Sequence, residues 1–194
     1  MTADIGRKSI FEITELPAGV DFRLPEYRRE VFHRFYEFHL ENKSHPGCIY
    51  YAMPWLIKHF SLDEEQRLWL VFINGNTQNI VTTWRIFERF DTAASVTTPA
   101  AETWFNDNYA NLAWDTDRRY HKKDFLKSVQ GYSQLTGDNQ AEFFRRLYGN
   151  REEDSFRRVW DTVRKSFYTF GRLSTFSYLE YLRIVGCPIL CNEL

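Results

Sequence analysis

The sequence lacks the features that identify secreted, metal-binding or membrane-spanning proteins. Its three cysteines are an odd set with no CxxC pair, which disfavours a disulfide framework and a cysteine-based zinc site. It has no apolar run long enough to cross a bilayer and no signal-peptide pattern at its N-terminus. We therefore expect a cytoplasmic protein without a membrane segment and without a resident metal.

The sequence also lacks an excess of charge of either sign. Its 25 Lys and Arg residues are matched by 26 Asp and Glu residues, so composition excludes a uniformly basic surface for nucleic acid. One segment, residues 115–123, is nevertheless densely basic. Such a segment is typical either of a solvated loop or of a contact with DNA phosphates, and the sequence leaves both interpretations open. The cations concerned are Arg118, Arg119, Lys122 and Lys123.

Strand patterns, internal repeats and low-complexity tracts are absent too, and helical spacing of apolar residues runs through most of the chain. We predict an all-α protein with an N-terminal arm over residues 1–22 and a compact, multi-helix catalytic domain over residues 23–194. The chain stops soon after Gly186 in what looks like an interruption, so we expect it to be part of a longer protein. Aromatic residues make up 18% of the sequence, and this abundance predicts rings that line a pocket or stack on a ligand.

Capping residues and helix breakers predict where the helices begin and end. A capping box at residues 61–64 predicts one helix start, and Pro54 is expected in the first turn of the short helix before it. Thr98-Pro99 and Asn139 are expected to begin two later helices. Longer helices are expected over residues 25–42 and 151–170.

The most informative stretch is residues 68–90. An apolar helix is expected to stop at a polar segment, Asn74 to Asn79, after which a second apolar helix begins. Unpaired amides between two apolar helices cost roughly 1–3 kcal/mol each, so these amides should be hydrogen-bonded to backbone or to a ligand. The segment is therefore either a ligand site or a helix–helix corner with Gly75 as left-handed C-cap and Thr77 as the next N-cap.

Two places carry polar groups suited to a phosphorylated ligand. Gly171-Arg172-Leu173-Ser174 breaks one helix, and Ser174 is expected to cap the next. Free backbone N–H groups and the Arg172 guanidinium would then converge on an anion. The helix after the corner has a polar face made by Gln78, Thr82, Arg85 and Arg89. This face is either solvated or the open end of a cleft, in which Gln78 and Asn79 would be the recognition amides.

Three motifs occur in an order that resembles a known family. They are YAMPW, FINGNTQNIVTTWRIFERF and FYTFGRLSTFSYLEYLRIVG, and the resemblance covers most of residues 24–186. The chain resembles the α-glutamyl/putrescinyl-thymine pyrophosphorylases of phages, also called amino acid:DNA transferases. The second motif, followed by TPAAETWFNDNY, is also similar to the opening of the catalytic region of helix-hairpin-helix DNA glycosylases.

The resemblance implies a glycosylase-like helical fold and a reaction on double-stranded DNA that carries pyrophosphorylated 5-hydroxymethyluracil. Pyrophosphate leaves the exocyclic methylene, and the amine of an amino acid or polyamine takes its place. No cofactor is implied, apart from a Mg²⁺ ion that would arrive with the pyrophosphate.

The matched motifs contain a candidate for each chemical role. A flipped base needs amides that read its edge, which Gln78 and Asn79 offer, and Thr82 and Tyr178 are further expected substrate contacts. The leaving pyrophosphate needs cations and N–H donors, for which Arg172 with Ser174 is the first choice and Arg85 the second. The attacking amine must lose a proton, and Glu180 is the candidate base. These candidates are Gln78, Asn79, Thr82, Tyr178, Arg172, Ser174, Arg85 and Glu180.

One departure from the glycosylase pattern limits the interpretation. Glycosylases use a glycine-rich hairpin to bind phosphate, and the chain has no LPGVG-like stretch, so base excision is disfavoured. A glycosylase acting on a modified pyrimidine and a non-catalytic helical DNA-binding module stay as the two alternatives.

Overall fold

The computed structural model describes residues 24–41, 48–137 and 139–190, and the chain divides into two compact units, Met1–Gly47 and Cys48–Leu194. The described part of the first unit is a single helical segment, η1 (Pro25–Tyr27) continuing into α1 (Arg28–Glu41). Pro25 lies in the first turn, as predicted. The predicted arm, residues 1–22, lies outside the described residues. We call the second unit the main unit.

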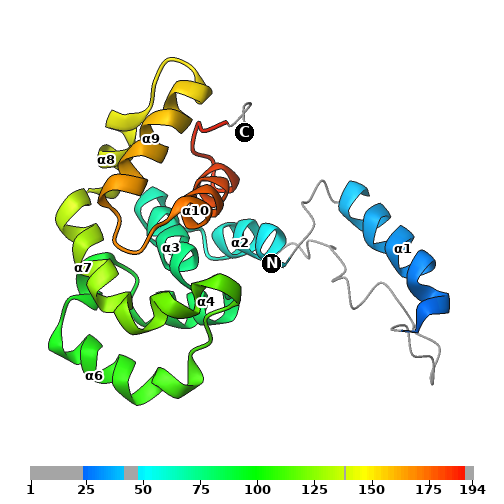
Figure 1. The fold of residues 1–194 in the computed structure, drawn as a ribbon, viewed down its shortest axis with the longest axis horizontal. Coiled ribbons are helices and arrows are strands. Elements are labelled where there is room, and N and C mark those ends of the chain that lie inside the picture. The colour runs from blue at the N-terminus through cyan, green and yellow to red at the C-terminus, as the bar shows by residue number, and fades with distance from the viewer. Residues whose placement is uncertain (1–23, 42–47, 138, 191–194) are drawn as a thin grey trace, which may run out of the picture. The chain divides into compact units, whose positions relative to one another are not determined.

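The main unit is entirely helical in its described residues, which confirms the all-α prediction. None of the described helices has both the length and the apolar character needed to span a membrane. Figure 1 shows α3 in the middle of the unit, with α8 and α9 at one end and α6 at the other. The elements are α2 (Cys48–His59), α3 (Glu64–Thr77), α4 (Ile80–Arg89), α5 (Ala93–Val96), α6 (Pro99–Asn108), η2 (Tyr109–Asn111), η3 (Thr116–Asp124), α7 (Phe125–Thr136), α8 (Gln140–Leu147), α9 (Glu152–Ser166) and α10 (Arg172–Ile184).

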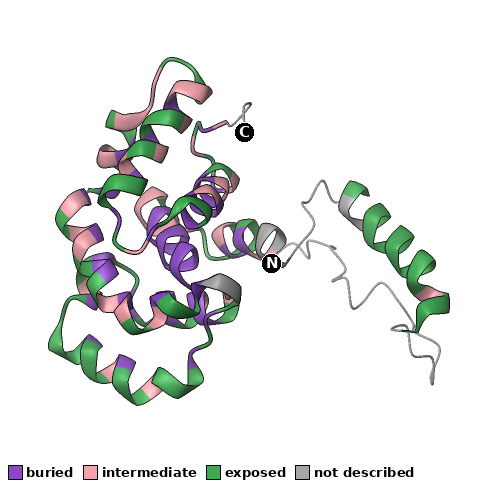
Figure 2. Cartoon of the chain, in the orientation of Figure 1, coloured by how far each residue is buried: buried purple, intermediate pink, exposed green. Residues whose placement is uncertain are grey.

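Helix α3 is the centre of the core. Every residue from Leu68 to Thr77 is buried, and Figure 2 shows this stretch as the longest buried segment of the fold. It packs against α4, α8, α10 and η3. Many of the chain's aromatic rings are used here, for example Phe72, whose ring centroid lies 3.8 Å from that of Tyr132. The Trp69 indole N–H donates to the Phe90 carbonyl at 2.7 Å and ties α3 to the end of α4.

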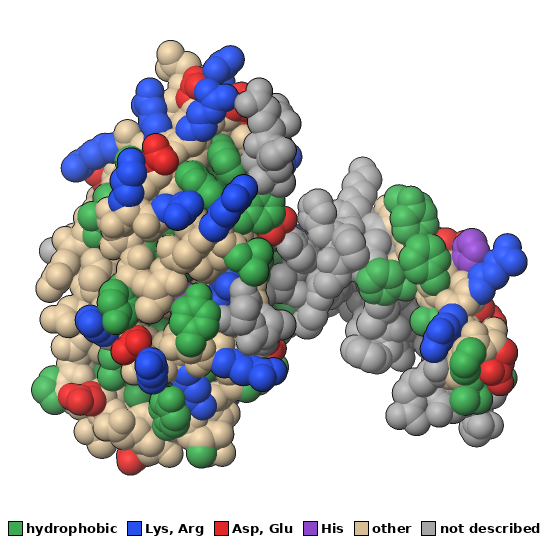
Figure 3. Space-filling view, viewed as in Figure 1, with side chains coloured by type: hydrophobic (Ala, Val, Ile, Leu, Met, Phe, Trp, Pro, Cys, Tyr) green, Lys and Arg blue, Asp and Glu red, His purple; other side chains and the backbone are tan. Residues whose placement is uncertain are grey.

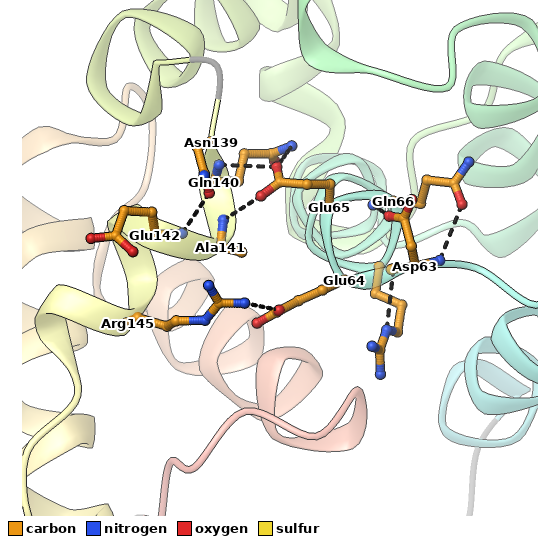
Figure 4. Close-up of polar contacts among 10 residues, drawn as sticks. Asp63, Glu64, Glu65, Gln66, Asn139, Gln140, Ala141, Glu142 and Arg145 are labelled. Carbon is orange, nitrogen blue, oxygen red and sulfur yellow. Dashed lines mark hydrogen bonds and ion pairs between the residues drawn. The ribbon is translucent and has the colours of Figure 1, made fainter.

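The N-terminus of α3 is held by two carboxylates with different roles (Figure 4). Asp63 is the N-cap, and its side chain and that of Gln66 form the capping box, two residues later than the sequence predicted. Glu65 reaches across to the start of α8, where its carboxylate accepts from the backbone N–H groups of Gln140 at 2.9 Å and Ala141 at 2.6 Å. A carboxylate at a helix N-terminus satisfies orphan donors and complements the helix dipole, so Glu65 joins α3 to α8.

Two predicted helix boundaries are wrong. Pro54 lies inside α2, which begins six residues earlier at Cys48, because the residues before it are already helical. Helix α9 ends at Ser166 and does not continue to Phe170, because the backbone is already extended at Phe167 and then turns at Thr169, whose φ is +68°. The starts at Pro99 and Gln140, capped by Thr98 and Asn139, are confirmed.

A thiol and several tyrosine hydroxyls with raised pKa values make the fold less stable at alkaline pH. Burial raises the pKa of the Cys187 thiol from 9.0 to about 11, and it also raises the pKa values of Tyr132, Tyr148 and Tyr178. The unfolded chain ionises these groups first, so their contribution to stability is complete below about pH 9 and is lost as pH rises through and beyond that value.

We therefore expect the free energy of unfolding, measured by urea denaturation and circular dichroism, to be flat up to about pH 9 and then to fall steadily toward pH 11. Cys187→Ala should flatten the first part of the decline. A curve as steep in Cys187→Ala as in the parent would contradict the assignment to this thiol.

Candidate functional site

The polar segment between α3 and α4 is a helix–helix corner. Helix α3 continues through it to Thr77, Gln78 is the left-handed C-cap with φ +47°, and Asn79 is the N-cap of α4, accepting from the Thr82 N–H at 2.9 Å. The corner interpretation therefore describes the backbone, although its predicted capping residues are wrong. Gly75 lies within the helix, and the Thr77 hydroxyl pairs with that of Thr83 at 2.7 Å.

The corner's two outer amides are both engaged. Asn79 uses its carbonyl oxygen for the cap and donates its NH₂ group to the Asp115 carboxylate at 2.9 Å. The Gln78 NH₂ group donates to the Tyr181 hydroxyl at 3.4 Å, and the Gln78 side chain is half-buried. Asn79 therefore acts here as a structural cap, and Gln78 stays a predicted base contact.

The C-terminus of α3 is capped by the segment that leads into η3. The Asp115 N–H donates to the Thr77 carbonyl at 2.9 Å, and the Arg118 guanidinium Nε–H donates to the Gly75 carbonyl at 3.0 Å. The last carbonyls of a helix have no partner within it and carry partial negative charge. A cation with directed N–H groups is therefore well suited to this position, and the Arg118 side chain is 0% exposed.

This burial corrects the predicted DNA-contacting patch. Arg118 does not lie on the surface with the other cations, because its guanidinium is used to cap α3. Arg119 and Lys123 are exposed, and Lys122 is half-buried with its ammonium 4.1 Å from the centroid of the Tyr109 ring. Figure 3 shows Lys and Arg side chains spread over the visible face, with apolar and acidic side chains among them. The patch is thus reduced to three cations.

A buried polar network lies next to the corner. The Asn76 NH₂ group donates to the Phe72 carbonyl at 3.0 Å, which fixes its oxygen as an acceptor. That oxygen lies 3.1 Å from Ser128 Oγ and 3.3 Å from His121 Nδ1, and His121 Nδ1 lies 2.9 Å from Thr169 Oγ1. His121 Nδ1 must therefore carry a proton.

The network joins three distant segments: the corner, η3 with α7, and the loop between α9 and α10. None of its members is among the predicted site residues. The sequence marks His121 only as part of the basic segment, and the left-handed backbone of Thr169 has no signal in its residue type, because β-branched residues rarely adopt it. One amide of the corner is less well paired: the Asn74 oxygen accepts from Thr83, but its buried NH₂ group has no partner among the described residues.

The start of α10 differs from the prediction in its cap. Gly171 is the N-cap, no side chain caps the helix, and the buried Ser174 hydroxyl donates to the Gly171 carbonyl at 3.2 Å. The prediction that Ser174 caps α10 is therefore wrong, because the helix begins two residues before it. Arg172 is the first residue of α10 and is exposed, so its guanidinium lies at an N-terminus whose backbone N–H groups receive no side-chain cap.

The other predicted contacts fall into an inward and an outward group. The Thr82 side chain is buried, and its hydroxyl accepts from the Ala113 N–H at 2.9 Å; Tyr178 is fully buried in the aromatic core. This conformation does not present either to a substrate. Arg85 is exposed and donates to the Asn111 carbonyl at 3.4 Å, and Glu180 is half-buried on α10.

No group of three or more His, Cys, Asp and Glu side chains that could hold a metal ion occurs within residues 24–41, 48–137 and 139–190. His45 and Cys191, two residues of types that can bind zinc, lie outside the described residues.

Comparisons with known proteins match the chain to one family model and to a phage protein. A family model described as "Amino acid:DNA transferase" matches residues 48–192, which is nearly the whole main unit. A protein named serinyltransferase from Salmonella phage ViI is 29% identical over 175 residues, covering 86% of this chain and 42% of the relative. The chain therefore spans less than half the length of that relative. No solved structure matches, so a likeness to the DNA glycosylase fold stays a prediction.

Proposed function

Because the chain belongs to the amino acid:DNA transferase family, we propose that it attaches the amine of an amino acid to a modified pyrimidine in DNA. The observation that carries the proposal is the family match over residues 48–192, which includes the corner, the basic segment and the start of α10. Serine is the first donor to test, since the phage relative is named a serinyltransferase.

In the proposed reaction the substrate base is 5-(pyrophosphoryloxymethyl)uracil. The amine nitrogen attacks the exocyclic methylene, a C–N bond forms as the C–O bond to pyrophosphate breaks, and the nitrogen loses one proton. The protein needs to stabilise the departing pyrophosphate and to accept that proton. Arg172 is the proposed partner of the pyrophosphate, and Glu180 is the proposed proton acceptor. Gln78 is proposed to contact the edge of the base, and Arg85 is the second proposed partner of the pyrophosphate.

The function is tested by mass spectrometry of nucleosides. DNA that contains 5-(pyrophosphoryloxymethyl)uracil is incubated with the protein and with serine, other amino acids and polyamines in parallel, then digested. The expected product is a thymidine derivative enlarged by one amino acid, with release of pyrophosphate. Free base would point to a glycosylase, and bound but unchanged DNA would point to a binding module; either result contradicts the proposal.

The three remaining cations of the basic patch, Arg119, Lys122 and Lys123, lead to a separate prediction about DNA binding. Removing the cation that neutralises one phosphate should lower the slope of log K against log salt by roughly 0.9, so Arg119→Ala with Lys123→Ala should flatten it by roughly 2. The measurement is fluorescence anisotropy with duplex DNA over a salt series. Arg146→Ala with Arg158→Ala, which removes two exposed arginines elsewhere, is the matched control. Equal slopes in both double variants would remove the patch from the DNA interface.

A further inference from the structure

A hollow of about 500 Å³ lies between α7 and the end of α9 with the loop that follows it. One wall is a face of α7 that carries Lys127, Gln130, Gly131 and Gln134, and the other includes Lys165 and Thr169. The volume is within the range of small-molecule sites. None of the residues assigned above to the base or to the pyrophosphate lines it.

The hollow is positively charged and rich in donors. Two lysines and two amides line it, and no Asp or Glu is among its lining residues. The Lys127 ammonium donates to the Tyr168 hydroxyl at 3.0 Å, and this contact raises the pKa of Lys127, so it stays charged at neutral pH. Lys165 has Asp161 as an ion-pair partner at 3.8 Å, and both side chains are largely exposed. Such a set of groups attracts an anion and repels a cation.

Gly131 keeps the hollow open. It lies in the interior of α7, where glycine is among the poorest helix formers. Packing does not require it, because a Cβ at this position would meet no atom within 4 Å. Gly75 is the opposite case: a Cβ there would lie 2.8 Å from the Tyr178 ring. The space next to Gly131 is therefore open to a ligand from solution.

The opposite wall is held in a strained conformation by the buried network. Thr169 has φ +68°, which is unfavourable for a β-branched residue. Its hydroxyl lies 2.9 Å from His121 Nδ1, which in turn lies 3.3 Å from the Asn76 oxygen in α3. Strain of this kind persists only where surrounding contacts impose it, and it is common at ligand sites.

We propose that this hollow binds the carboxylate of the amino-acid co-substrate. The assignment rests on the proposed function and adds a place for the donor. A small concave site suits a free amino acid better than a DNA backbone, which needs cations along an extended surface. Two nearby ammonium groups also favour the neutral form of the donor's amine, the form that can attack, and they disfavour a dicationic polyamine.

The proposal is tested by binding in the absence of DNA, so that its failure is separable from failure of the reaction. Saturation-transfer NMR with L-serine should give a signal that ethanolamine, which is serine without its carboxylate, and putrescine do not give. Gly131→Leu places a large side chain in the hollow, and it should not disrupt α7 because leucine forms helices better than glycine. Lys127→Met removes one positive charge. Each substitution should weaken serine binding at least tenfold. Lys58→Met, which removes an exposed lysine of α2 away from the hollow, is the control and should bind as the parent does.

Several outcomes would overturn the assignment. Equal binding of ethanolamine and serine would show that the carboxylate is not recognised, and unchanged binding in Gly131→Leu would place the donor elsewhere. Weakened duplex binding in Lys127→Met, with no saturable serine signal in the parent, would make the hollow a phosphate contact. Serine binding with no product from modified DNA would instead contradict the proposed function and leave the site in place.

Discussion

Gly75→Val is expected to lower the free energy of unfolding by about 3 kcal/mol or more. Gly75 lies in α3 where the helix passes under α10, and a Cβ there would lie 2.8 Å from Tyr178 Cδ2 and 3.3 Å from Phe170 Cζ. Neither ring can move away at low cost, because both are buried in the aromatic core. Replacing glycine improves helix propensity by less than about 1 kcal/mol, so the clash outweighs the gain.

The matched control is Gly131→Ala, the same kind of change in an open helix interior. With nothing within 4 Å of the new methyl group, it should raise the free energy of unfolding by up to about 1 kcal/mol. Urea unfolding followed by far-UV circular dichroism measures both. If the two variants shifted stability in the same direction, the close approach of α3 and α10 at Gly75 would be wrong.

Local signals explain which parts of the fold the sequence predicts. Thr98 and Asn139 cap helices that begin with the next residue, so each prediction needed only neighbours in the chain. The all-α class follows in the same way from the spacing of apolar residues.

Contacts between distant residues explain what the sequence does not predict. The basic neighbours of Arg118 predict an exposed cation, either solvated or in contact with DNA, yet its partner is the Gly75 carbonyl 43 residues away. His121 meets Asn76 across 45 residues and Thr169 across 48. Because the Arg118 guanidinium, from a distant segment, caps the C-terminal end of α3, the helix does not need a glycine C-cap. It extends past Gly75 to Thr77.

These contacts also change the functional interpretation of the corner. Asn76 contacts His121 of η3, Asn79 donates to Asp115 just before η3, and Arg118 of η3 donates to Gly75 of α3, so the corner is first a rigid support. The loop between α9 and α10 lines the hollow through Thr169 and leads into α10 at the exposed Arg172.

The largest effect on activity is expected from Arg172→Ala. Removing a charge that stabilises a leaving group in the transition state typically costs 10²–10³ in turnover, so kcat for transfer to modified DNA should fall by about that factor. Arg172 is exposed and begins α10, so the substitution removes no core contact and the fold should be unaffected. Arg172→Lys should recover only part of the rate, since an ammonium lacks the planar pair of N–H groups that matches phosphate oxygens.

Time courses of nucleoside formation, followed by mass spectrometry at saturating serine, measure this effect. Arg183→Ala removes an exposed arginine from the other end of α10, where the helix dipole repels anions, and it should keep the parent rate. The two proposed sites then separate by kinetics: Arg172→Ala lowers kcat, whereas Gly131→Leu raises KM for serine. A fully active Arg172→Ala variant would move pyrophosphate stabilisation to Arg85, the other exposed arginine proposed to contact the substrate.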